Sequence, residues 1–217
     1  MITRILVTGF EPFDGALRNP SGDAARALEG RELRREDGEA GWSAQITSRV
    51  LPVVWEVAGS ALLEAVREVG PAIVLCLGMA QGTFRVERFA DDVCRDRLDN
   101  AGKRPAQVRE QASVRLASRL PVERIEQALN ALGVPVEPSE DAGGFLCNQV
   151  FFALLSACAA GEVPSVERAG FLHVPSDAFV PSQITQAHVE AAVVAALGVT
   201  LEELAEAACS TARASRG

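Results

Sequence analysis

The sequence lacks the features of several common protein classes. Its net charge of −8, from 21 Lys and Arg against 29 Asp and Glu, gives no excess of positive charge to attract phosphate backbones or anionic membranes. Its first residues, MITRILVTG, reach a glycine after one short apolar run broken by Arg4. Such a start fits neither a secretion signal nor a membrane span. We therefore expect a cytoplasmic protein that binds neither nucleic acid nor membranes.

Cysteine and histidine are also scarce. The five cysteines are odd in number and include no CxxC pair, which disfavours a disulfide framework and a zinc site. We expect free thiols and no bound metal. Neither a P-loop nor a dinucleotide-binding fingerprint occurs. The only histidines are His173 and His188, so chemistry that needs an imidazole must use one of them.

Apolar, β-branched runs alternate with longer amphipathic stretches along the chain, which is typical of βαβ units around a mainly parallel sheet. The sequence therefore predicts an α/β fold. A length of 217 residues and a hydrophobic content of 48% fit a single domain over residues 1–217. RILVTG, AIVLCLG and AGFLHVP are continuous apolar runs, typical of central strands covered on both faces. Strands are predicted at 2–8, 44–51, 72–77, 134–137 and 170–174.

Helix signals lie between these runs. NPSGDAARALEG, for example, begins with capping residues and ends in glycine, which are start and stop signals. Residues 30–41, charged and glycine-bearing, are predicted to form a surface loop. Residues 91–118 are rich in Asp, Arg and Gln without a clear period, so we interpret them as a long loop or lid. Helices are predicted at 21–28, 54–69, 122–132, 147–160, 182–197 and 201–212.

Ligands of open α/β sheets bind beyond the carboxyl ends of the strands. Four candidates stand at such ends: GFEPFDG, GMAQGTFRVERFADD, Cys147 at the start of a helix, and His173 at the end of GFLH. A cysteine in a first helical turn meets unpaired NH groups and the positive end of the helix dipole, which favour the thiolate. Free cysteine is also a common inert core residue. Cys147 by itself is therefore compatible with either role.

A cysteine nucleophile needs a nearby base and a third group that orients the base. His173 is the better candidate base, because His188 in TQAHVEAAVV is explained simply as a helix-surface residue. Glu87 in VERFA is the acid best presented after the third strand. The plainer interpretations are a hydrogen-bonded core histidine for His173 and a salt bridge with Arg85 or Arg88 for Glu87.

The loop GFEPFDG holds two phenylalanines, Phe10 and Phe13, with no obvious reason to face water. They either plug the top of the sheet or form the wall of a small pocket. The residues alone favour the plug.

Six motifs in one order resemble pyroglutamyl peptidase type I, also called pyrrolidone carboxyl peptidase: VTGFEPFDG…NPS, VLPVVW, CLGMAQG…VERFA, DNAG, AGGFLCNQVFF and GFLHVPS. Such an ordered set, matching over nearly the whole chain, is far more specific than any single motif. The resemblance implies a cysteine exopeptidase (omega peptidase) that removes N-terminal pyroglutamate from peptides. It also implies an α/β/α sandwich, assembly as a homotetramer, and no metal or cofactor.

The resemblance also implies roles for individual residues. Cys147 of FLCN corresponds to the family's nucleophile, His173 of GFLHVP to its base, and Glu87 of ERFA to the third member of the triad. A thioester acyl-enzyme is then the expected intermediate. The expected walls of the pocket for the pyroglutamyl ring are Phe10, Phe13, Phe145 and Leu146.

Some positions depart from the family pattern. The loop after DNAG lacks the usual Gly-Pro and aromatic segment, and Asp14, Met79, Asp92, Glu140 and Asp141 stand where other residue types are common. Because carboxylates near a thiolate raise its pKa, a rival hypothesis stays open: a weakly active or inactive relative that binds pyroglutamate or a similar small lactam. A third hypothesis, a nucleoside-phosphorylase-like enzyme, rests on fold analogy alone, and the sequence contains no phosphate-binding loop.

Overall fold

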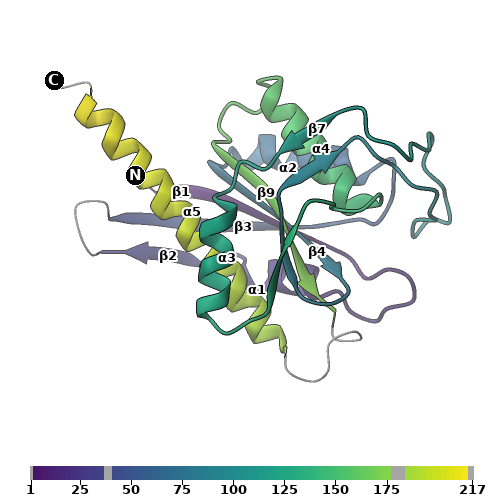
Figure 1. Ribbon diagram of the computed structural model, residues 1–217, viewed down its shortest axis with the longest axis horizontal. Helices are drawn as coiled ribbons and strands as arrows, with labels where there is room; N and C mark the ends of the chain where they lie inside the picture. Colours follow the sequence, from purple (N-terminus) through teal and green to yellow (C-terminus); the bar gives the residue numbers. More distant parts are fainter. Residues whose placement is uncertain (1, 37–40, 177–183, 215–217) are drawn as a thin grey trace.

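A seven-stranded sheet forms the centre of the computed structural model, which describes residues 2–36, 41–176 and 184–214 (Figure 1). The strand order is β2-β3-β1-β4-β9-β5-β8. The strands are β1 (Thr3–Phe10), β2 (Glu32–Arg35), β3 (Trp42–Leu51), β4 (Ile73–Ala80), β5 (Phe84–Glu87), β8 (Val136–Ser139) and β9 (Arg168–Pro175). A separate two-stranded ribbon pairs β6 (Phe89–Asp91) with β7 (Arg115–Ala117).

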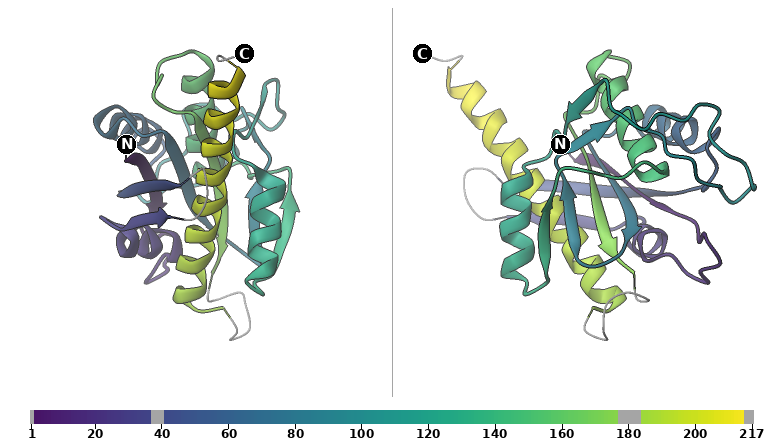
Figure 2. Two further views of the ribbon diagram at one scale, coloured as in Figure 1. Left: turned by 90° about the vertical axis from the view of Figure 1, so that its left-hand side faces the viewer. Right: turned by 45° about the vertical axis from the view of Figure 1, so that its right-hand side comes forward.

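Helices cover both faces of the sheet, as Figure 2 shows. On one face, α1 (Pro20–Leu28), α3 (Val122–Ala131) and α5 (Gln186–Ala214) share an apolar cluster with the strands. On the other face, α2 (Ala58–Val69) and α4 (Leu146–Ala159) share a second cluster. Successive strand residues point to opposite faces, so Ile5 and Val7 join the first cluster and Leu6 the second. The architecture is therefore the α/β/α sandwich that the resemblance implies.

The three continuous apolar runs form the middle of the sheet, as predicted: β1, β4 and β9 are adjacent. Parallel pairing joins β1 to β3 and β4, β4 to β9, and β5 to β8. Two pairs are antiparallel, β2 with β3 and β5 with β9. The second antiparallel pair matters for the site, because a short turn after β4 sends β5 back along the far side of β9.

The structure corrects several local predictions. The predicted loop at 30–41 contains a strand, because β2 adds to the sheet edge by pairing with β3, and positions 37–40 of that prediction lie outside the described residues. The two predicted C-terminal helices are one helix, α5. The helix continues through the predicted break. Thr200 Oγ1 is satisfied within the helix, because it donates a hydrogen bond to the Ala196 carbonyl at 2.7 Å. Gly198 lies on an open side of the helix, where a Cβ would meet nothing within 4 Å. Positions 182–183 of the predicted helix lie outside the described residues.

The long segment 91–118 is largely irregular, as predicted. It contains β7 and an isolated bridge between Cys94 and Arg109. All five cysteines lie in the described residues and are free thiols, also as predicted. Among the described residues, none of the helices has the length and apolar character that a membrane crossing requires.

Candidate active site

Cys147 is the second residue of α4, and its half-buried side chain faces a cavity. The N-cap residue Phe145 has extended backbone angles, φ −113 and ψ −163, and makes no side-chain cap hydrogen bond. The first amide groups of a helix have no partner within the helix. Together with the helix dipole, these NH groups make the surroundings of Cys147 favourable for negative charge.

The sulfur of Cys147 fits against β4 because residue 78 is a glycine. A Cβ at Gly78 would lie 2.7 Å from Cys147 Sγ and 2.6 Å from a ring carbon of Phe171. Any larger residue would therefore displace the thiol, the ring or both. The motif CLGMAQG contains this glycine, but nothing in the motif indicates which side chain the glycine approaches.

His173 and Glu87 meet across neighbouring strands. His173 Nδ1 lies 2.6 Å from Glu87 Oε1, and the side chains are 5% and 0% exposed. The second oxygen, Glu87 Oε2, accepts a hydrogen bond from Ser139 Oγ at 2.5 Å. Ser139 is the register partner of Glu87 on β8. Sequence reasoning missed Ser139, because a lone hydroxyl outside any motif gives no signal.

Glu87 is thus a buried partner of the imidazole rather than a surface ion-pair residue. Arg88 instead pairs with Glu123 and Glu126, and Arg85 makes no ion pair with any described residue. A buried carboxylate is stable only when hydrogen bonds satisfy it. His173 and Ser139 supply one to each oxygen of Glu87.

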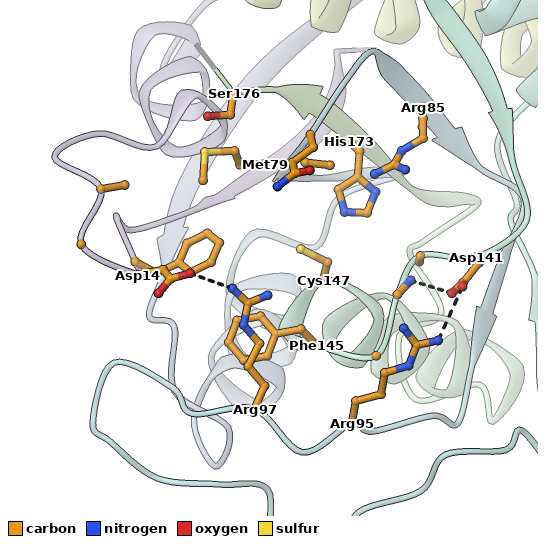
Figure 3. A pocket seen from close by; sticks show the side chains of 18 residues that line it. Asp14, Met79, Arg85, Arg95, Arg97, Asp141, Phe145, Cys147, His173 and Ser176 are labelled. Atoms are coloured by element: carbon orange, nitrogen blue, oxygen red, sulfur yellow. Dashed lines mark hydrogen bonds and ion pairs between the residues drawn. The ribbon is translucent and has the colours of Figure 1, made fainter. Parts of the chain in front are cut away.

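The pKa of His173 is raised. Burial by itself would lower the pKa, but hydrogen bonding with Cys147 and Glu87, together with their charges, outweighs burial and raises it from 6.5 to about 9. The imidazole therefore carries its proton at neutral pH. Since Nδ1 faces Glu87, the other ring nitrogen is left for Cys147, whose side chain lies below the ring in Figure 3.

Phe13 and Phe145 line the cavity, which has a volume of about 710 Å³. Their ring centroids are 6.0 Å apart, and Trp55 packs edge-on against Phe145 at 5.0 Å. Phe10 and Leu146 are 3% and 1% exposed and belong to the apolar cluster below. They support the wall from behind rather than line it, because the end of β1 and the first turn of α4 direct them into the core.

These features bring Cys147, His173 and Glu87 to one edge of an aromatic-walled cavity. The family model for pyroglutamyl peptidase matches residues 3–213. The chain belongs to the pyroglutamyl peptidase family. The resemblance drawn from the six motifs is thereby confirmed.

Individual relatives agree with this assignment. The chain is 37% identical to a pyrrolidone-carboxylate peptidase of Cupriavidus pinatubonensis, over 87% of this chain and 84% of the relative. It is also 37% identical to pyrrolidone-carboxylate peptidase 1 of Ralstonia nicotianae, over 91% of both chains. The crystal structure of pyroglutamyl peptidase I from Bacillus amyloliquefaciens superimposes with a TM-score of 0.78 at 29% identity, covering 92% of this chain and 97% of that one.

The structure of a mutant pyrrolidone carboxyl peptidase from the hyperthermophile Pyrococcus furiosus gives a TM-score of 0.79 at 33% identity, covering 93% of this chain and 100% of the other. Both the sheet and the positions of the helices are therefore those of the pyroglutamyl peptidase family.

Two carboxylates that depart from the family pattern lie in the cavity wall, and each faces an arginine. Asp14 pairs with Arg97 at 3.2 Å, and Asp141 pairs with Arg95 at 3.7 Å. Asp14 has φ +56, in the left-handed region that favours glycine, so its backbone is strained. Because each carboxylate has a cationic partner, neither leaves an uncompensated charge facing the thiol.

Arg97 also contributes to the aromatic wall. Its guanidinium lies 4.5 Å from the ring centroid of Phe145 and 5.4 Å from that of Phe13. Cation–π contacts of this kind hold the guanidinium over the rings. Sequence reasoning missed this residue, because it lies in the segment that was interpreted only as a loop.

Asp92, another departure, anchors the long segment. It forms an ion pair with Arg109 and accepts hydrogen bonds from the backbone amides of Val114 at 2.9 Å and Ser113 at 2.7 Å. These hydrogen bonds hold its pKa below the usual range. Asn148, next to Cys147, ties the same segment to α4 by donating to the Asp91 carbonyl at 2.7 Å and accepting from the Asp91 amide at 3.0 Å.

Proposed function

We propose that the chain, as a single catalytic domain, is a cysteine exopeptidase that hydrolyses the bond following an N-terminal pyroglutamyl residue. The observation that carries this proposal is the alignment of Glu87, His173 and Cys147 beside a cavity walled by Phe13 and Phe145. Membership of the pyroglutamyl peptidase family supports the choice of substrate.

The aromatic wall suits a pyroglutamyl ring, which is a neutral lactam. Its flat ring packs against the wall formed by Phe13 and Phe145, and its NH and carbonyl groups are free to bond with backbone groups. Ring binding then holds the scissile carbonyl carbon over Cys147 Sγ, since α4 begins directly after Phe145.

Acylation begins with His173 protonated and Cys147 as the thiolate, and Cys147 Sγ attacks the carbonyl carbon. The negative charge that develops on the carbonyl oxygen is stabilised by the free amide groups at the start of α4. His173 then donates its proton to the leaving amine as the C–N bond breaks, which leaves a thioester on Cys147. Glu87 acts as a positioning residue that stabilises the imidazolium.

Deacylation runs the same steps with water as the nucleophile. His173 takes a proton from water, the hydroxide oxygen bonds to the thioester carbon, and the C–S bond breaks. This restores the resting pair of Cys147 thiolate and His173 imidazolium, and free pyroglutamate leaves.

Turnover of a chromogenic pyroglutamyl amide under reducing conditions tests the proposal. Wild type should release the chromophore and Cys147→Ser should not. The rival hypothesis predicts that wild type releases no chromophore, although calorimetry detects its binding of pyroglutamate.

We further propose a cytoplasmic homotetramer. The support for this is the family resemblance, together with five free thiols, which fit a reducing compartment. Native mass spectrometry should find a species of four times the 23.0 kDa chain. A monomer at micromolar concentration would contradict the tetramer without affecting the proposed reaction.

A further inference from the structure

Arg85 is the one arginine of the cavity wall that lacks an acidic partner among the described residues. The other two, Arg95 and Arg97, pair with Asp141 and Asp14. The Nε atom of Arg85 is buried and has no hydrogen-bond partner. Buried donors are nearly always satisfied in native proteins. The part of the Arg85 guanidinium that lines the cavity therefore has no anion beside it among the described residues, and an anionic group that arrives with a ligand can supply one.

The position of Arg85 is fixed by strand register. Arg85 on β5 stands directly opposite His173 on β9, and it lies two residues before Glu87. Residues two apart on a strand share a face, so Arg85, Glu87 and His173 project into the same side of the sheet. Figure 3 shows Arg85 beside the imidazole, with Phe145 at the other end of the cavity and Cys147 between them.

Because Phe145 and Arg85 lie at opposite ends of the cavity with Cys147 between them, the two sides of the scissile bond contact different residues. In the proposed reaction, on which this inference rests, the pyroglutamyl ring lies against Phe145 and Phe13. His173 gives its proton to the leaving amine, so the leaving residue lies on the side of His173. Arg85 is on that side. The cavity of about 710 Å³ is larger than a five-membered lactam requires and has room for a following residue.

We infer that Arg85 binds a carboxylate on the residue that follows pyroglutamate and so determines the preference at that position. A planar guanidinium matches a carboxylate through paired N–H donors. The carboxylate has two sources: the α-carboxylate of a pyroglutamyl dipeptide, or the side chain of Asp or Glu in a longer peptide.

A supporting role for Arg85 in holding Glu87 is a poor alternative. Both oxygens of Glu87 are already bound, by His173 and Ser139. An additional cation is not needed to satisfy this carboxylate. A purely electrostatic role would also affect all substrates equally, which the following measurement separates from carboxylate binding.

The test compares kcat/KM on matched substrates that differ in one charge. One arm uses pGlu-Ala and pGlu-Ala-NH2, and the other uses pGlu-Glu-NH2 and pGlu-Gln-NH2. Wild type should prefer the carboxylate form by on the order of 10-fold in at least one arm, and the arm identifies the source. Arg85→Gln should bring that ratio close to one, and Arg85→Lys should retain part of it.

Arg34→Gln is the matched control, because it removes the same charge from the edge strand β2, where Arg34 pairs with Glu32 outside the cavity. Its ratios should equal those of wild type. In wild type, the preference should also shrink at high salt, which gives a readout that does not depend on the folding of a variant.

Three results would overturn the inference: wild-type ratios near one in both arms, ratios unchanged in Arg85→Gln, or an equal loss on charged and neutral substrates. The first two leave the proposed function standing, provided that the neutral amides are cleaved. Absence of turnover on all four substrates would overturn the proposed function and the inference with it.

Discussion

The hydrogen bond between His173 Nδ1 and Glu87 Oε1, 2.6 Å long, joins two buried side chains that come from antiparallel neighbours in a mainly parallel sheet. The carboxylate charge of Glu87 therefore lies next to the imidazole in a buried position, where water does not screen the interaction. This charge is one of the contributions that raise the pKa of His173 to about 9.

Glu87→Gln should lower the pKa of His173, because the amide keeps the shape of the carboxylate but loses its charge. The imidazolium then loses its proton at a lower pH, so the alkaline limb of kcat/KM should move below its wild-type position near pH 9. The loss of activity at neutral pH should be smaller than that caused by removing Cys147 or His173. A pH profile that keeps the wild-type alkaline limb would show that another group supports the charge.

The two histidines provide a direct comparison. His188 is exposed and bonds locally with Thr185, whereas His173 is buried beside Cys147. His173→Gln should reduce kcat by about 100-fold to 10,000-fold, the usual contribution of general acid–base catalysis. His188→Gln should stay close to wild type. Equal effects in steady-state kinetics would remove the proton-transfer role from His173.

Iodoacetamide should alkylate Cys147 first. Burial raises the pKa of Cys76 to about 12 and also raises the pKa values of Cys94 and Cys158, so their thiolates are rare at neutral pH. Peptide mapping after brief labelling locates the modified residue. Loss of activity with the label on Cys76 would contradict the nucleophile assignment, and Cys147→Ala should retain the fold while losing at least about 1,000-fold in kcat.

Gly78→Ala should impair catalysis through a single methyl group. The new Cβ would lie 2.7 Å from Cys147 Sγ, closer than real contacts allow. A displacement of the nucleophile by about 1 Å costs on the order of 100-fold in rate. Gly59→Ala is the control, because its Cβ would make an ordinary 3.7 Å contact with Ala153. Similar kcat values for the two variants would show that β4 moves aside to accommodate the methyl group.

The aromatic wall should reject cationic analogues. N-terminal proline has nearly the shape of pyroglutamate but carries a charged ring nitrogen at neutral pH, and N-terminal glutamine retains an ammonium group. The guanidinium of Arg97 already lies over both rings, so a second, unpaired cation buried beside Phe13 and Phe145 meets a like charge. Its burial costs several kcal/mol, a discrimination on the order of 1,000-fold. Relative kcat/KM on pyroglutamyl, prolyl and glutaminyl amides measures it, and Phe13→Leu should lose less activity than Phe13→Ala. Comparable values on prolyl and pyroglutamyl amides would show that these rings do not form the specificity pocket.

The elements that the sequence predicted best are those with strong local patterns. Continuous apolar runs identified β1, β4 and β9 as central because burial on both faces leaves no room for polar residues. The four-residue β5 was missed, since it owes its existence to pairing with β8 and β9, which lie about 50 and 85 residues away along the chain. Local patterns do not encode such pairing.

In the candidate site, too, the sequence predicted the residues with a local signal and missed those that depend on distant neighbours. The residue types and the helix start made Cys147 a candidate, and the family resemblance linked it to His173 and Glu87. Their approach depends on the register of β5 against β9, which no motif specifies. For the same reason Ser139 and Gly78 were missed: each matters only through a neighbour distant in sequence.

The catalytic residues and the arginines of the cavity wall come from different parts of the fold, and this has a consequence for how the enzyme family diversifies. The nucleophile, base and acid stand on α4, β9 and β5, whereas Arg95 and Arg97 come from the irregular segment. Insertions and substitutions are tolerated more readily in loops than in sheets. A lineage can therefore remodel one side of the cavity, and with it the choice of peptide, while the reacting atoms stay where the sheet holds them.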